Sequence, residues 1–176
     1  MATVRDKFWL WGHDAGSHNI GWNAPAESRI TPVEAACYMD VPNVIMVRYG
    51  QHSMAPTDQY IVPFKALNNV VWSIVGGSGC NTDEETTYVI TDLPNKLPNM
   101  TGVMMDDFFR NTKSEENVAT YTLDQLKDVQ GRLSASGRKL DLWVVLYSYQ
   151  LDPPVKNHLA LCDKVSFWTW HSSDLP

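Results

Sequence analysis

The sequence has few cysteines and none of the spacings that build a cysteine-based fold. Its 176 residues include three cysteines, Cys37, Cys80 and Cys162, and no Cys-x-x-Cys pair. An odd number without that spacing supports neither a disulfide framework nor a zinc knuckle. We therefore expect buried free thiols and a fold that is held together by its apolar core.

Long hydrophobic runs and basic clusters are also missing. No run reaches the roughly 18 apolar residues of a membrane-spanning helix, and residues 1–7 are too short and polar for a signal sequence. The sequence assigns no compartment, and export stays open if a leader is removed. The formal net charge is −6 without a Lys/Arg cluster, which argues against nucleic acid and anionic membrane as partners.

What the chain does have is a composition typical of one compact domain. Hydrophobic residues make up 44% and charged residues 19% of the sequence. A chain of this length buries a substantial core without staples. We therefore expect a single domain spanning residues 1–176. The oligomeric state is left open.

Six short apolar or β-branched runs alternate with helix signals. Three of these signals are capping boxes, in which a Thr is followed three residues later by Glu or Gln, at Thr31, Thr82 and Thr122. Alternation of this kind predicts parallel strands with covering helices. The predicted strands are residues 8–12, 43–48, 69–75, 102–107, 140–147 and 164–170.

Two architectures fit this alternation, a (β/α)8 TIM-type barrel and an open doubly wound parallel sheet. Most strands are followed by polar or aromatic side chains, and a barrel gathers such strand ends around one rim. This favours the barrel. An eightfold barrel needs roughly 250 residues, so we expect about six strand-helix units here, with the last two absent. The open sheet is the alternative.

The fourth predicted strand ends in two adjacent carboxylates, Asp106 and Asp107, after the apolar residues 103–105. Burying a charge is costly unless it is paired, so these acids are expected to face a pocket at the carboxyl end of the sheet. Two close carboxylates favour proton transfer, because one is driven toward its protonated form. The alternative is a helix N-cap at Asp107. Neighbouring strand residues point to opposite faces, so both can serve one site only if the strand ends or bulges there.

An Asp-Asp pair at the end of a hydrophobic fourth strand resembles the catalytic motif of O-GlcNAcase-like hexosaminidases. The resemblance covers about eight residues within a chain that looks like a glycoside-hydrolase-type barrel. It implies that Asp106 assists the 2-acetamido group of the substrate and that Asp107 is the general acid/base. Chitinase-like barrels do not fit, because Phe108 stands where their catalytic Glu belongs.

Further candidates follow the other strands. We expect His13, Asp14 and His171 to hydrogen-bond a carbohydrate, and Arg48 either to clamp it or to pair with Asp14, Asp106 or Asp107. Trp11, Trp170 and Tyr149 lie nearest the rim and are candidate stacking platforms for sugar rings, whereas Trp9, Trp72, Trp143 and Trp168 are expected in the core. Asp174 is either a second acid from the sixth strand or a helix cap.

The sequence therefore predicts a glycosidase acting on an oligo- or polysaccharide by carboxylate acid/base catalysis, without a cofactor. One alternative is a metal-dependent hydrolase that uses His13, Asp14, His18 and Asp107, although their spacing matches no standard metal motif. A second alternative is a carbohydrate-binding barrel without catalysis.

Overall fold

The computed structural model describes residues 3–19, 23, 26–49, 58–77 and 81–174. Six strands form one all-parallel sheet, and their order in space follows their order in the chain. Each strand lies where the sequence predicts one, with bounds shifted by at most two residues. The strands are β1 (Leu10–Gly12), β2 (Asn43–Met46), β3 (Asn69–Val75), β4 (Met100–Met105), β5 (Asp141–Tyr147) and β6 (Lys164–Trp168).

The helices begin where their capping residues place them. In all three predicted capping boxes the Thr hydroxyl accepts a hydrogen bond from the backbone N–H three residues on, and that residue's side chain accepts from the Thr backbone. These boxes start α1 (Pro32–Met39), α2 (Asp83–Thr91) and α4 (Leu123–Ser134). Shorter elements are α3 (Leu93–Lys96), α5 (Lys156–Leu159) and the 3₁₀ helices η1 (Arg5–Lys7), η2 (Pro63–Ala66), η4 (Ser148–Gln150) and η5 (Ser172–Asp174).

The sheet has a different apolar cluster on each face, because alternate strand residues point to opposite sides. One face packs against the helices in a cluster that includes Val103 and Met105 of β4 and Leu126 and Val129 of α4. The other face carries a smaller cluster, described here as the inner cluster: Ile45, Val47, Val71, Met104, Trp143, Val145 and Tyr147, with Trp9, Trp11 and Trp168 packed against it. Of the tryptophans expected in the core, Trp72 lies on the helix side and the others in the inner cluster.

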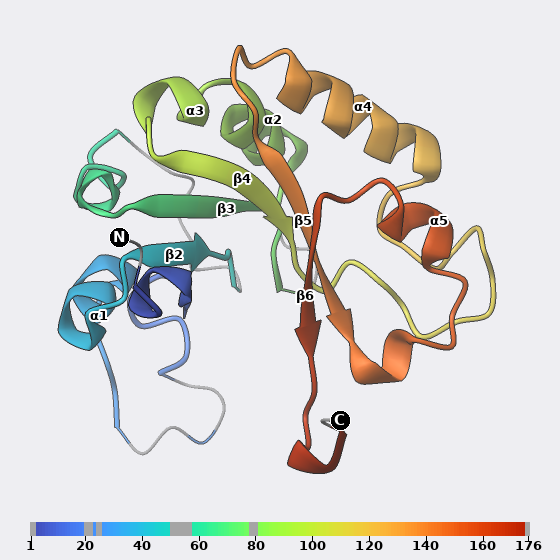
Figure 1. The fold of residues 1–176 in the computed structure, drawn as a ribbon, viewed down its shortest axis with the longest axis horizontal. Helices are drawn as coiled ribbons and strands as arrows, with labels where there is room; N and C mark the ends of the chain where they lie inside the picture. Colours follow the sequence, from blue (N-terminus) through green and yellow to red (C-terminus); the bar gives the residue numbers. More distant parts are fainter. Residues whose placement is uncertain (1–2, 20–22, 24–25, 50–57, 78–80, 175–176) are drawn as a thin grey trace.

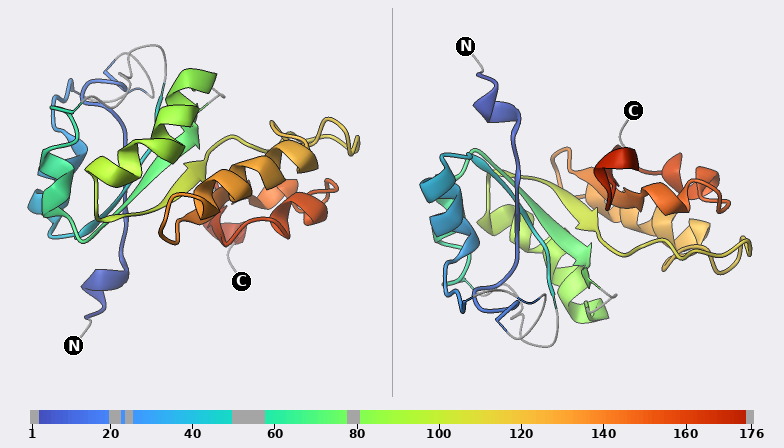
Figure 2. Two further views of the ribbon diagram at one scale, coloured as in Figure 1. Left: turned by 90° about the horizontal axis from the view of Figure 1, so that it is seen from above. Right: turned by 90° about the horizontal axis from the view of Figure 1, so that it is seen from below.

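The sheet curls as a half-barrel. The strand direction turns progressively from β2 to β6 (Figure 1), and α1 and α4 lie at opposite ends of the molecule (Figure 2). The strand order never reverses, which separates this topology from a doubly wound sheet with a switch point. Among the described strands, β1 and β6 are the two edges of the sheet.

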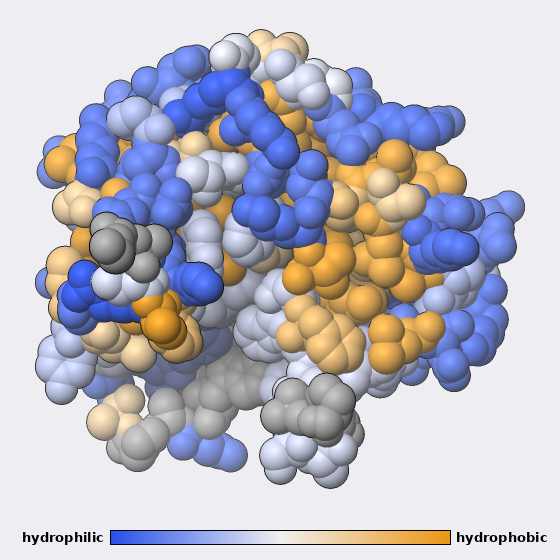
Figure 3. All heavy atoms as spheres, in the orientation of Figure 1, coloured by the Kyte–Doolittle hydropathy of each residue, from blue (hydrophilic) through white to orange (hydrophobic). Residues whose placement is uncertain are grey.

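Strand β6 is the least covered part of the sheet. Val165 and Phe167 are 47% and 49% exposed, whereas the residues of β5 beyond Asp141 are buried. Hydrophobic atoms gather on the side of the molecule where β6 and α5 lie (Figure 3). An edge strand with exposed apolar side chains is a site where another chain can add to the sheet.

The expectation of buried thiols is wrong for Cys37, which is exposed on α1 while its neighbour Ala36 packs into the core. Cys162 is partly buried, and burial raises the pKa of its thiol to about 12. Cys80 lies outside the described residues. Within the described part of the chain, no helix combines the length and the apolar character needed to cross a bilayer.

Candidate active site

A cavity of about 220 Å³ opens at the carboxyl ends of the strands, above the inner cluster. In a parallel sheet this is the edge at which ligands bind. Residues that follow five of the six strands meet there, although they are far apart in the sequence. The cavity is lined by Trp11, His13, His18, Tyr49, Gly77, Asp106, Asp107, Tyr147, Trp168 and Trp170.

Asp106 and Asp107 reach this one cavity because β4 ends just before them, at Met105, and the chain turns at Asp107. Met104 belongs to the inner cluster, so Asp106, two residues later, continues the same face. By alternation alone Asp107 would face the helices, beside Met105. Its backbone instead adopts φ 46°, in the left-handed region that Asp tolerates better than most residues. The structure thus meets the condition for both acids to serve one site.

The two carboxylates lie in different environments. Asp106 is 7% exposed and its backbone N–H still donates to the Val75 carbonyl at 2.8 Å, as a continuation of the ladder. Asp107 is exposed. Burial, followed by the negative charge of Asp107, raises the pKa of Asp106 to about 7. A carboxyl with this pKa is partly protonated at neutral pH and can donate a proton.

Tyr147, the last residue of β5, connects the acids to the neighbouring strand. Its hydroxyl donates to Oδ1 of Asp107 at 3.0 Å. Burial, and then the negative charges of Asp106 and Asp107, raise the pKa of the Tyr147 hydroxyl, so it stays a proton donor. A second contact fixes the end of β5, because the Gln150 side chain accepts from the Tyr147 backbone N–H and donates to the Phe109 carbonyl.

Aromatic rings surround the acids. Trp11 and Trp168 pack edge to face with their ring centres 4.8 Å apart. Tyr149 and Trp170 each lie nearly parallel to the Tyr147 ring, at 9° and 10°, with ring centres 5.3 and 6.0 Å away. Tyr149 is 49% and Trp170 56% exposed. The rim beside Asp107 therefore offers two open aromatic rings, of which Trp170 lines the cavity.

Two histidines and a tyrosine, His13, His18 and Tyr49, also line the cavity. The Nδ1 of His13 lies 2.9 Å from the Val47 carbonyl, so this nitrogen carries the proton and Nε2 has the lone pair. Burial is the main cause that lowers the pKa of His13. The His18 ring stacks on Tyr49 with centres 4.4 Å apart and meets His13 edge to face at 4.7 Å.

Several predicted site residues lie elsewhere. Asp14 accepts a hydrogen bond from the Tyr60 hydroxyl and lines a neighbouring pocket between the loop after β1 and helix α1. Arg48 forms an ion pair with Glu85 of α2. His171 is exposed, and Asp174 ends η5, beyond Trp170.

Four residues that line the cavity, Tyr49, Gly77, Tyr147 and Trp168, were not identified from the sequence as site residues. Trp168 was expected in the core. Tyr147 ends an apolar run and reads as core, Tyr49 follows the second strand without a motif, and Gly77 has no side chain. A Cβ on Gly77 would lie 3.0 Å from Tyr49 and 3.6 Å from Asp106 Oδ2. Only the position of Tyr147 at a strand end could have indicated its role.

The metal-site arrangement considered from the sequence is not assembled in the described residues. No group of three or more His, Cys, Asp or Glu side chains in that part of the chain could hold a metal ion. Among the expected ligands, His13 is bonded to a backbone carbonyl and Asp14 to Tyr60.

In comparisons with known proteins, no family model, no curated protein and no solved structure matches the chain.

Proposed function

We propose that the protein is a glycoside hydrolase that cleaves an oligo- or polysaccharide by carboxylate acid/base catalysis. The observation that carries the proposal is the pairing of Asp106 and Asp107 in one aromatic-lined cavity, with the pKa of Asp106 raised to about 7. Glycosidases use two carboxyl groups, one of which must be protonated to assist the leaving group.

In the proposed mechanism the buried acid is the proton donor. Asp106 gives its proton to the glycosidic oxygen as the bond between that oxygen and the anomeric carbon breaks. Water then adds to the anomeric carbon, and the Asp106 carboxylate takes up the proton that the water releases. Asp107, held by the Tyr147 hydroxyl, keeps a carboxylate beside the positive charge that develops on the sugar ring. The resemblance to O-GlcNAcase-like hexosaminidases assigns the proton donor to Asp107 instead, and the experiment below separates the two assignments.

The remaining walls suit a sugar. The apolar C–H face of a pyranose can lie on the exposed ring of Trp170, and hydroxyl groups can donate to the lone pair of His13 Nε2. The cavity volume of about 220 Å³ is below the roughly 300–1,000 Å³ of pockets that enclose drug-sized ligands. It therefore encloses one small unit, and further units extend over the rim.

We further propose that the sheet belongs to the (β/α)-barrel class. Parallel strands in sequential order, a curled sheet and polar groups at the carboxyl edge support this assignment. A crystal structure with a bound sugar would test the proposed site, because the ligand should lie over the inner cluster and contact Asp106 and Asp107.

The experiment compares wild type with Asp106→Asn and Asp107→Asn on a panel of aryl glycosides that includes 2-acetamido sugars, each with a good and a poor phenol leaving group. Loss of a general acid lowers turnover by roughly 10²–10⁴-fold, and a good leaving group restores most of this. We expect such rescue for Asp106→Asn and none for Asp107→Asn. The reverse pattern would assign the proton to Asp107.

Asp128→Asn on the exposed side of α4 is the matched control, and it should retain full activity. Full turnover by either folded Asn variant of the pair would contradict the proposal. Saturable sugar binding without product release by wild type would favour the carbohydrate-binding alternative.

A further inference from the structure

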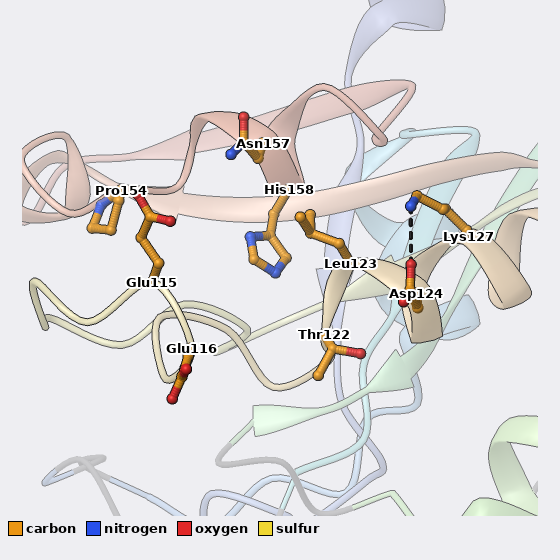
Figure 4. Close-up of a pocket in the computed structure, with 9 residues that line it drawn as sticks. All are labelled: Glu115, Glu116, Thr122, Leu123, Asp124, Lys127, Pro154, Asn157 and His158. Atoms are coloured by element: carbon orange, nitrogen blue, oxygen red, sulfur yellow. Dashed lines mark hydrogen bonds and ion pairs between the residues drawn. The ribbon is translucent and has the colours of Figure 1, made fainter.

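A second pocket lies away from the acid pair, between the loop that follows β4 and helix α5. Its volume is about 560 Å³, and none of the residues that line it lines the cavity of Asp106 and Asp107. Figure 4 shows its nine lining residues, Glu115, Glu116, Thr122, Leu123, Asp124, Lys127, Pro154, Asn157 and His158.

His158 gives this pocket an unusual hydrogen-bonding group. The residue is 5% exposed, and its ring points from α5 into the space between Glu115 and Thr122 (Figure 4). Its Nε2 lies 3.1 Å from the Tyr121 carbonyl, which can only accept, so Nε2 carries the proton. Burial lowers the pKa of His158, and the neutral ring therefore has a lone pair on Nδ1. That nitrogen has no hydrogen-bond partner in the structure.

The charges around the ring have one predominant sign. Three carboxylates, Glu115, Glu116 and Asp124, line the pocket with a single cation, Lys127. The Lys127 ammonium lies 2.9 Å from Asp124 Oδ1, so these two charges offset each other. The charges of Glu115 and Glu116 then make the local electrostatic potential negative. Leu123 and Pro154 add apolar surface. An anion is disfavoured here, whereas a cation with an apolar stem matches both the charge and the walls.

We propose that this pocket binds a small organic cation with N–H donors, namely an alkylguanidinium or a primary alkylammonium. One N–H donates to His158 Nδ1, the positive charge lies near Glu115 and Glu116, and the alkyl stem lies on Leu123 and Pro154. A buried acceptor without a partner is destabilising, and such a ligand supplies the donor.

The imidazole is held in place before any ligand arrives. The rings of Phe108 and Phe109 each pack against it with centres 6.2 Å away, while Nε2 is bonded to Tyr121. Phe108 follows Asp107 directly in the chain, so the residue next to the acid pair also packs against the ring of His158. The proposal nevertheless concerns binding alone and does not depend on the glycosidase assignment.

The experiment titrates the whole protein with butylguanidinium and, separately, with butyltrimethylammonium, which has the same charge but no N–H. Binding is followed by calorimetry and by the imidazole ¹⁵N signals, with His158 assigned from a His158→Gln variant. We expect saturable butylguanidinium binding that moves the Nδ1 signal of His158 to lower chemical shift, and at least threefold weaker binding of the quaternary ion.

The surface variant Glu115→Gln/Glu116→Gln leaves the packing around His158 intact, and it should weaken butylguanidinium binding roughly two- to fivefold per carboxylate. Glu84→Gln on the exposed face of α2 is the matched control and should not change it. Equal affinity for both cations, an unchanged His158 signal at saturation, or no saturable binding would each overturn the proposal. If His158→Gln does not fold, the glutamate variants and the pair of cations still decide the result.

Discussion

The Tyr147 hydroxyl donates to Asp107 Oδ1 across 3.0 Å, and this bond joins the end of β5 to the turn that follows β4. It orients an exposed carboxylate whose backbone is in the left-handed region. The ring of Tyr147 meanwhile packs in the inner cluster. A single side chain thus couples the core of the sheet to the position of a proposed catalytic oxygen.

Replacing Tyr147 with Phe should keep the fold and impair the site. The ring remains, and loss of one hydrogen bond to a charged group costs about 1.5–3 kcal/mol, so we expect kcat/KM to fall by about tenfold or more. Steady-state kinetics on the best aryl glycoside would measure this. Tyr38→Phe, at an exposed position on α1, is the control. Unchanged kcat/KM for Tyr147→Phe would show that the bond does not support catalysis.

Replacing Asp106 with Asn should change how stability depends on pH. Because the pKa of Asp106 is raised to about 7 from 3.8, the folded protein binds more protons than the unfolded chain between these values. Its free energy of unfolding therefore falls as pH rises from about 4 to about 7. Relative to Asp106→Asn, wild type should lose up to about 4 kcal/mol over this range.

Urea denaturation of both proteins at several pH values from 4 to 8 would measure this difference. Asp128→Asn should instead follow the wild-type pH dependence. Parallel curves for wild type and Asp106→Asn would contradict the raised pKa and remove the main support for Asp106 as the proton donor.

The ion pair of Arg48 with Glu85 should contribute to stability. Their side chains are only 17% and 13% exposed, so Arg48→Met leaves a largely buried carboxylate without its cation. We expect the free energy of unfolding to fall by about 2–3 kcal/mol, somewhat less than for a fully buried pair. Adding Glu85→Gln should recover part of this loss. A double-mutant cycle by chemical denaturation measures the coupling, and additive effects would contradict it.

Two glycines should respond to alanine in opposite ways. Gly131 lies on the exposed side of α4, and a Cβ there would have no neighbour within 4 Å, so Gly131→Ala should stabilise by about 0.5–1 kcal/mol. Gly102 lies in β4, where a Cβ would be 2.4 Å from the Asp141 carbonyl oxygen. Gly102→Ala should therefore lower the free energy of unfolding by about 1–3 kcal/mol. Thermal unfolding of both variants should show shifts of opposite sign.

Local signals in the sequence were sufficient to predict the six strands and the starts of the three longest helices. The capping boxes at Thr31, Thr82 and Thr122 start helices because each one satisfies the free backbone groups of the first turn without help from the rest of the chain. The six apolar runs are strands because both faces of this sheet carry an apolar cluster. The curl of the sheet and the order of its strands depend on packing between distant segments. The sequence therefore only narrowed the architecture to a barrel or an open sheet.

The site was predictable to the extent that it depends on strand ends. Asp106, Asp107, Trp11, His13 and Trp170 come together because they lie at the carboxyl ends of parallel strands of one curled sheet. Arg48 was harder to place, because its partner Glu85 lies in a helix on the other face of the sheet. Tyr147 was not identified as a site residue because its place at a strand end does not show which group it contacts, and its hydrogen bond to Asp107 is seen in the structure.

The turn at Asp107 restricts what evolution or an engineer can place there. Residues other than Gly, Asn and Asp are strained in this backbone conformation. Most substitutions of Asp107 would therefore remove the carboxylate and distort the backbone at the same time. Asparagine alone removes the charge while it keeps both the shape and the bend. A scan with alanine would therefore overstate the chemical importance of this position, whereas the Asp-to-Asn exchange isolates it.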